Sequence, residues 1–296
     1  MLVIGLFGPT ASGKSDVAAA VTDLISAEVV SADAMQVYDG LPILTNRSVH
    51  RERLVGIWPL SYVASVGEYA PLAHAAVDAV LADGRTPLVV GGTGLYFRAA
   101  LAELELPPAP APGVRERWER LYDEDAKAAH ARLGELDAAA AERVHPNDRR
   151  RVIRALELAE AGSSLVPRLE TLFGGGWRHP TLLVGLAVPK EELERRIAER
   201  TRRMFEAGVE EEVRSALRTE LSATARKIIG LHEVATLPRA EAIEALIVRT
   251  RQYAAYQRKW LRRLEGLVMV AADRPPEETA AEIVALARTR ERLSRS

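Results

Sequence analysis

The segment FGPTASGKSD, close to the N-terminus, restricts the possible folds more than any other part of the chain. It fits the pattern G-x-x-x-x-G-K-[ST] of a phosphate-binding loop, or P-loop. Its glycines let backbone N–H groups converge on phosphate oxygens, Lys14 adds a positive charge, and the helix that follows adds a favourable dipole. Ser15 is expected to bind Mg²⁺. The residues expected to contact phosphate are Gly8, Thr10, Ala11, Ser12, Gly13, Lys14 and Ser15.

A P-loop connects a strand to a helix, and the sequence provides both elements. Residues 2–7 form a short apolar run, and a helical pattern begins at Lys14. Further apolar runs at 27–33, 86–94 and 181–189 alternate with helical segments. This alternation is typical of a parallel sheet with helices on both faces. We therefore predict an α/β fold: a P-loop-type parallel sheet covered by helices.

A long helical segment interrupts the alternation. The proline-rich stretch at 107–113 is followed by charged, alanine-rich sequence without a strand signal, and a second break lies at 161–180. We predict an all-helical insertion at 112–165 within a catalytic core formed by 1–111 and 166–296.

The composition excludes several classes of site. The chain has no cysteine, which excludes disulfides, thiolate metal sites and cysteine nucleophiles. No apolar run is long enough to span a bilayer, and the apolar N-terminus lacks the basic lead of a signal peptide. The net charge of −1 argues only weakly against nucleic-acid binding, because totals hide local patches. We expect a cytoplasmic monomer with no membrane association.

Asp33 is the one early carboxylate at the end of a predicted strand, where open α/β sheets bind their ligands. The strand that leads into Gly91-Gly92-Thr93-Gly94 ends without an acid. Three interpretations of Asp33 are open. It organises a metal ion, as in a nucleotide kinase; it is a general base that faces an acceptor; or it only caps a turn.

Several motifs, taken in order and spacing, resemble one family. They are GPTASGKS, SADAMQVYDGLPILTNR, GGTGLYFRAAL, HPNDRRRVIRALE, VGLAVPKEELERRIAERTRRMFEAGVEEEV, IIGLHEV and TRQYAAYQRKW. Together they cover nearly the whole chain, and they resemble the tRNA dimethylallyltransferases, also called tRNA isopentenyltransferases. The resemblance implies transfer of a dimethylallyl group from dimethylallyl diphosphate to N6 of an adenine next to the anticodon, at position 37 of tRNA.

The resemblance also assigns chemical roles. The P-loop would hold the diphosphate leaving group, with Mg²⁺ near Ser15 and the Thr10 hydroxyl as a further donor. Arg200 corresponds to the family's diphosphate-binding arginine, whose planar fork can bind two phosphate oxygens. Asp33 would remove the proton from the adenine amine. Asp33, Thr10 and Arg200 are therefore the expected catalytic residues.

The same resemblance implies that the protein binds the anticodon stem-loop of tRNA. The target adenine must leave its stack to reach the base, and the insertion at 112–165 would clamp the stem-loop. Basic residues of the insertion and of 249–263 suit backbone phosphates. The expected tRNA contacts are Asp33, Ala34, Met35, Gln36, Thr93, Arg115, Arg149, Arg150, Arg151, Gln257 and Arg258.

Three other functions compete with this one. A small-molecule or nucleotide kinase would use the P-loop for ATP, with Arg149, Arg150 and Arg151 closing on the γ-phosphate. A non-catalytic RNA-binding module would keep the loop without the chemistry. An adenylate isopentenyltransferase would prenylate free AMP, ADP or ATP, although the long insertion and the basic 249–263 segment favour RNA as the acceptor.

Overall fold

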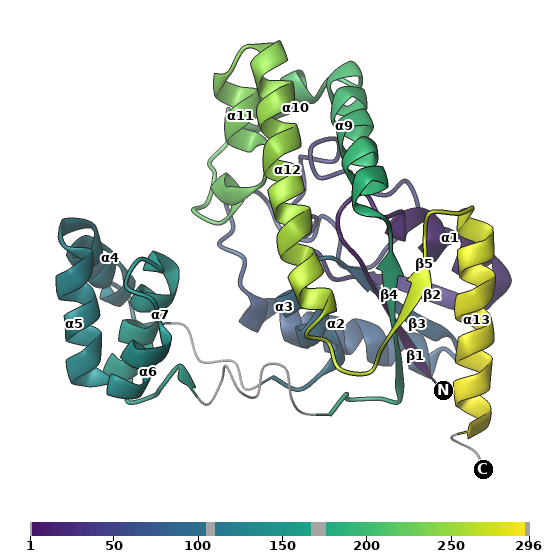
Figure 1. Ribbon diagram of the computed structural model, residues 1–296, viewed down its shortest axis with the longest axis horizontal. Coiled ribbons are helices and arrows are strands. Elements are labelled where there is room, and N and C mark those ends of the chain that lie inside the picture. The colour runs from purple at the N-terminus through teal and green to yellow at the C-terminus, as the bar shows by residue number, and fades with distance from the viewer. Residues whose placement is uncertain (1, 105–109, 167–175, 294–296) are drawn as a thin grey trace. The chain divides into compact units, whose positions relative to one another are not determined.

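The computed structural model describes residues 2–104, 110–166 and 176–293. The chain divides into two compact units, a core of Met1–Glu103 with Trp177–Ser296 and an insertion of Leu104–Gly176 (Figure 1). The sequence breaks predicted at 107–113 and 161–180 lie partly outside the described residues.

A parallel sheet forms the centre of the core. Among the described residues it has five strands in the order β2-β3-β1-β4-β5, and every neighbouring pair is parallel. The strands are rich in Val, Leu and Ile because helices bury most of them on both faces. The predicted α/β class is confirmed. The strands are β1 (Val3–Phe7), β2 (Ala27–Ser31), β3 (Thr86–Gly91), β4 (Thr181–Ala187) and β5 (Leu267–Ala271).

Helices cover the two faces of the sheet, and the alternation of side chains along β1 shows how (Figure 1). Leu6 packs with Val21 of α1 and Ile283 of α13, whereas the ring of Phe7 lies 5.1 Å from that of Phe97 on α3. The described helices of the core are α1 (Lys14–Leu24), α2 (Val66–Ala82), α3 (Gly94–Leu101), α9 (Lys190–Glu206), α10 (Val209–Ala216), α11 (Leu231–Thr236), α12 (Arg239–Leu261) and α13 (Pro276–Leu293), with a 3₁₀ helix at Ala225–Lys227.

The long helix α12 packs against the start of α3 at a glycine. A Cβ atom at Gly94 would lie 1.9 Å from the ring of Trp260, so this approach requires the absence of a side chain. The close packing holds α12 near the turn that follows β3, at the carboxyl edge of the sheet.

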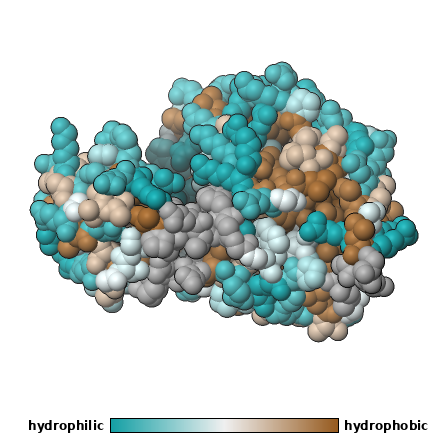
Figure 2. All heavy atoms as spheres, turned by 60° about the horizontal axis from the view of Figure 1, so that its bottom comes forward, coloured by the Kyte–Doolittle hydropathy of each residue, from teal (hydrophilic) through white to brown (hydrophobic). Residues whose placement is uncertain are grey.

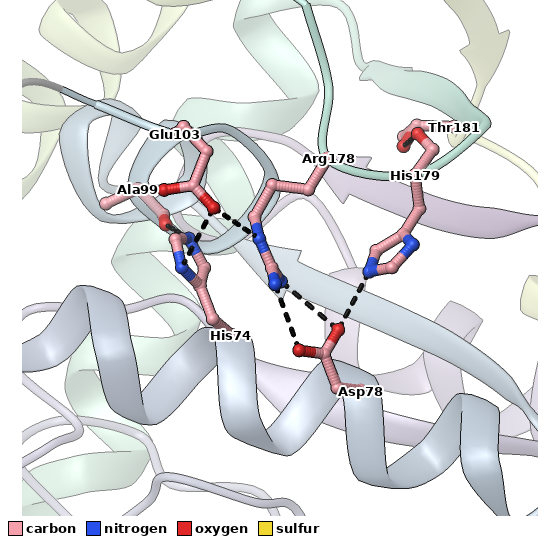
Figure 3. A network of polar contacts seen from close by, with 7 residues as sticks. All are labelled: His74, Asp78, Ala99, Glu103, Arg178, His179 and Thr181. Carbon is pink, nitrogen blue, oxygen red and sulfur yellow. Dashed lines mark hydrogen bonds and ion pairs between the residues drawn. The ribbon is translucent and has the colours of Figure 1, made fainter.

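A polar network fixes the two points where the insertion leaves and rejoins the core (Figure 3). Arg178 donates to Asp78 of α2 at 2.9 Å and to Glu103 at 2.8 Å, and its backbone N–H donates to the carbonyl of Leu101 at 2.9 Å. His179 Nε2 lies 2.8 Å from the same Asp78 carboxylate. The hydrogen bond from Arg178 holds the pKa of Asp78 below its ordinary value. Both connections are thus tied to α2.

The described part of the insertion is helical and has its own apolar core around Trp118, Leu133 and Leu156. Aspartates divide it into short helices, because Asp125, Asp137 and Asp148 each accept a hydrogen bond from a backbone N–H of the next helix. The helices are α4 (Val114–Glu124), α5 (Ala126–Leu136), α6 (Ala138–Arg143) and α7 (Arg149–Glu160).

The surface is mixed in character. On the face shown in Figure 2, apolar side chains gather on part of the core, while the insertion is largely hydrophilic. None of the helices in the described ranges combines the length and the apolar character that a membrane crossing needs.

Candidate active site

The loops that follow β1, β2 and β3 come together at the carboxyl edge of the sheet. The P-loop follows β1, Asp33 follows β2, and the Gly92-Thr93 turn follows β3. A cavity of about 880 Å³ opens at this edge, and the P-loop, Asp33, Gln36 and Arg200 line it. The sheet therefore brings most of the P-loop together with Asp33, Met35 and Gln36, as expected where parallel strands end, whereas Ala34 and Thr93 adjoin these residues without lining the cavity.

The P-loop has the backbone conformation that its glycines permit. Gly13 has a φ of 85° at the N-cap of α1, and Ala11 has a φ of 64°. A Cβ atom at Gly8 would lie 2.6 Å from Ser12 Oγ, so the loop closes on itself at this point. Ser12 Oγ is buried and has no hydrogen-bond partner among the described residues. Such a hydroxyl is suited to a phosphate oxygen.

Two partly buried cations face the cavity. Burial lowers the pKa of Lys14 to about 8, against the opposing attraction of Asp33. Burial likewise lowers the pKa of Arg200 to about 10, and Arg200 Nε has no hydrogen-bond partner in the described chain. Lys14 Nζ donates to the carbonyl of Pro9 at 2.8 Å. Because burial penalises both charges, an anion in the cavity would relieve that penalty.

A short hydrogen-bonded chain orders the segment that begins at Asp33, which also lines the cavity. Asp33 Oδ1 accepts from the backbone N–H of Met35 at 2.8 Å, so it caps the turn as well as lining the cavity. The N–H of Ala34 donates to Thr93 Oγ1 at 3.3 Å, and Thr93 Oγ1 lies 3.2 Å from the hydroxyl of Tyr253. These hydrogen bonds hold the backbone next to Asp33 in place.

Gln36 and Gln257 are both held by other parts of the chain. Gln36 Nε2 donates to the carbonyls of Thr45 and Asn46, each at 3.2 Å. Gln257 is 1% exposed, and its amide bonds to the P-loop and to the turn after β3. Arg258, the next residue, is exposed on the surface of α12.

Three further residues line the cavity without belonging to a motif that predicts a ligand contact. Glu52 lies in a loop, and burial raises its pKa, with repulsion from Asp33 acting in the same direction. Arg203 lies three residues after Arg200, one helical turn away, so the helical pattern of α9 could have identified it. Tyr253 also lines the cavity.

The arginines predicted for tRNA in the insertion have acidic neighbours, with one exception. Arg149 Nε lies 2.7 Å from Asp123, Arg115 Nε lies 3.3 Å from Glu157, and Arg151 Nε lies 3.5 Å from Asp148. Arg150 is exposed and forms no ion pair within the described residues. Their contact with RNA stays a prediction.

Comparison with known proteins identifies the family. A family model described as IPP transferase matches residues 36–264. The chain belongs to the IPP transferase family. Among curated relatives of this IPP transferase, the tRNA dimethylallyltransferase of Corynebacterium jeikeium (strain K411) is 37% identical over 292 residues, which cover 94% of each chain. That of Anaeromyxobacter dehalogenans (strain 2CP-C) is 38% identical and covers 96% of this chain and 99% of its own.

Solved structures of other proteins agree. The full-length tRNA isopentenylpyrophosphate transferase of Bacillus halodurans matches with a TM-score of 0.70 and 26% identity, over 100% of this chain and 99% of that one. A eukaryotic dimethylallyltransferase, described as acting on tRNA, matches with a TM-score of 0.81 and 25% identity, over 99% of this chain and 79% of that one. The IPP transferase family thus accounts for both the fold and the motif order.

Proposed function

We propose that this IPP transferase transfers a dimethylallyl group from dimethylallyl diphosphate to N6 of adenine 37 of tRNA and releases diphosphate. The observation that supports it best is the composition of one cavity. Lys14, Arg200 and the unpartnered Ser12 hydroxyl lie in the same cavity as Asp33. An anion-binding side and a carboxylate therefore share a single space, which suits a reaction with an anionic leaving group and a proton to remove.

The diphosphate side stabilises the leaving group. When the bond between C1 of the prenyl group and the diphosphate oxygen breaks, negative charge grows on that oxygen. The P-loop N–H groups, the Thr10 hydroxyl, Lys14 and Arg200 are the donors for this charge. Because they are already in place and partly desolvated, they stabilise the transition state more than the ground state.

The acceptor side removes a proton. As N6 of the adenine forms its bond to C1, the Asp33 carboxylate takes one proton from N6, which leaves a neutral secondary amine. Such general base catalysis contributes typically ~10²- to 10⁴-fold to the rate. Ala34, Met35, Gln36 and Thr93 adjoin Asp33 and are the proposed contacts to the target base.

Mg²⁺ is part of the proposal. The described residues contain no cluster of three or more His, Asp or Glu side chains that could hold a metal by themselves. The Ser15 side chain lines the cavity beside Lys14, so the donor set fits an ion that is held mainly by diphosphate oxygens. When bound, Mg²⁺ would neutralise part of the diphosphate charge.

The tRNA surface is proposed to include the insertion. Residues 112–165 would clamp the anticodon stem-loop through Arg115, Arg149, Arg150 and Arg151, while Arg258 of α12 would bind the RNA backbone from the core. Because tRNA is the proposed substrate, we expect the enzyme in the cytoplasm. We also expect it to be a monomer.

Labelled dimethylallyl diphosphate tests the function. The protein is incubated with it and total tRNA, the RNA is digested, and the labelled nucleoside is identified. We expect an adenosine with the label on N6. A parallel reaction with AMP tests the adenylate alternative, and a third with labelled ATP tests a kinase. Transfer to AMP in preference to tRNA, or phosphoryl transfer from ATP, would overturn the proposal.

A further inference from the structure

One side chain of α12 bonds to both of the loops that flank the cavity. Gln257 Oε1 accepts from the backbone N–H of Thr10 in the P-loop at 2.7 Å. Its Nε2 donates to the carbonyl of Gly92, in the turn after β3, at 2.9 Å. The amide thus joins two backbone groups that are far apart in the sequence.

Gln257 has little freedom to do anything else. The residue is 1% exposed, and a Cβ atom at Gly92 would lie 2.3 Å from its Nε2. Only a glycine at this turn leaves room for the amide. The tight fit and the two hydrogen bonds favour a fixed side chain over one that rearranges to meet RNA.

The same helix also orders the acceptor side, one turn earlier. The Tyr253 hydroxyl lies 3.2 Å from Thr93 Oγ1, which accepts from the N–H of Ala34 next to Asp33. Helix α12 therefore contacts the diphosphate loop through Gln257 and the Asp33 segment through Tyr253. A rigid helix that contacts both loops fixes the distance between them.

We infer that Gln257 is a positioning residue that holds the P-loop in its diphosphate-binding shape, and that α12 thereby sets the spacing between the donor loop and Asp33. This inference rests on the proposed function for the identity of the donor. The sequence predicts that Gln257 contacts tRNA; in this inference it positions the P-loop instead. Loop N–H groups that are fixed in advance bind an anion without a further loss of conformational freedom.

Inorganic pyrophosphate and a tRNA transcript are the two probes of this inference. Their dissociation constants are measured for Gln257→Leu, which keeps the size of the side chain and removes both hydrogen bonds. The matched control is Gln252→Leu, because Gln252 is exposed on the same helix and no hydrogen bond involves its side chain in the described structure. We expect Gln257→Leu to raise the Kd for pyrophosphate roughly 5- to 100-fold and to change the Kd for tRNA less than threefold. Gln252→Leu should change neither.

A second variant keeps the test decisive if Gln257→Leu does not fold. Gln257→Glu retains an acceptor for the Thr10 N–H, but it cannot donate to Gly92 when ionised and it adds a negative charge beside the loop. We expect it to weaken pyrophosphate binding at least as much as Gln257→Leu. In steady-state assays, either variant should raise the KM for dimethylallyl diphosphate while leaving the KM for tRNA within threefold.

Two results would overturn the inference. Normal pyrophosphate binding with weakened tRNA binding would show that Gln257 contacts RNA. An equal loss of both ligands in both variants would show that the amide supports only the fold. Pyrophosphate binding needs no turnover, so failure of the wild-type protein to prenylate tRNA would refute the proposed function and would leave this measurement interpretable.

Discussion

Arg200 in the core and Arg149 in the insertion are both helical arginines, yet their surroundings differ. Burial lowers the pKa of Arg200, and its Nε has no partner in the described chain. Arg149 lies 2.7 Å from Asp123, and that hydrogen bond raises its pKa. Burial of the Arg200 charge costs free energy that the attraction of Asp33 offsets only in part and that a bound anion would offset further, whereas the exposed Arg149 is already paired with Asp123. The comparison indicates that the charge of Arg200 is still open to a bound anion, whereas the charge of Arg149 is already balanced by Asp123.

Asp33→Asn is the change with the largest expected effect, because it separates chemistry from binding. We expect the rate of prenyl transfer to fall ~10²- to 10⁴-fold with little change in the Kd for tRNA, and we expect the Kd for pyrophosphate not to rise, because the removed charge repels an anion in the same cavity. Asp23→Asn, an exposed carboxylate on α1, is the control and should be fully active. Transfer by Asp33→Asn at the wild-type rate would remove Asp33 from the mechanism.

Arg200→Met and Arg149→Met test the comparison directly. Loss of a charged hydrogen-bond donor to phosphate should raise the Kd for pyrophosphate roughly 10- to 100-fold in Arg200→Met. Arg149→Met should bind pyrophosphate normally. Calorimetric titration of both variants provides the measurement. Equal affinities in the two variants would mean that the burial of Arg200 has no bearing on the ligand.

The pH dependence of pyrophosphate binding tests Lys14. Its pKa of about 8 means that the free protein carries the Lys14 charge below that pH and loses it above. An anion binds the protonated form better, so loss of the Lys14 charge should raise the Kd for pyrophosphate by up to about tenfold per pH unit above pH 8. Pyrophosphate also ionises in this range and the pKa of Arg200 is about 10, so the effect of Lys14 is measured as the ratio of the Kd of Lys14→Met to that of the wild type. The ratio should be large below pH 8 and should fall above it; a ratio that stays constant to about pH 9.5 would contradict the lowered pKa.

Salt titrations of tRNA binding test the insertion, where the expected effects are smallest. Arg150→Ala removes a cation without an ion pair and should reduce the slope of log K against log[salt] by about 0.9, with a loss of a few-fold in affinity. The double variant Arg149→Ala/Asp123→Ala leaves the net charge unchanged and should alter the slope less. A larger change in the double variant would show that Arg149 leaves Asp123 to bind RNA.

Local patterns predicted most of the fold and the P-loop that lines the cavity. The P-loop motif fixes its own backbone, and the apolar runs identify the strands because burial on both faces leaves little choice of residue. The division of the insertion at Asp125, Asp137 and Asp148 follows from helix capping, a local effect that can be read from the sequence. The bonds of Gln257 could not be predicted, because they join residues that only the tertiary fold brings together.

The network around Arg178 has a consequence for how such a protein can change. The backbone of Arg178 bonds to Leu101, so the chain leaves the core and returns at almost the same place. When a module is attached through two chain segments that lie side by side, closing the loop between them costs little conformational entropy. The sheet is also left undisturbed. The junction is therefore a place where another module could replace the insertion without redesign of the sheet or of the cavity at its edge.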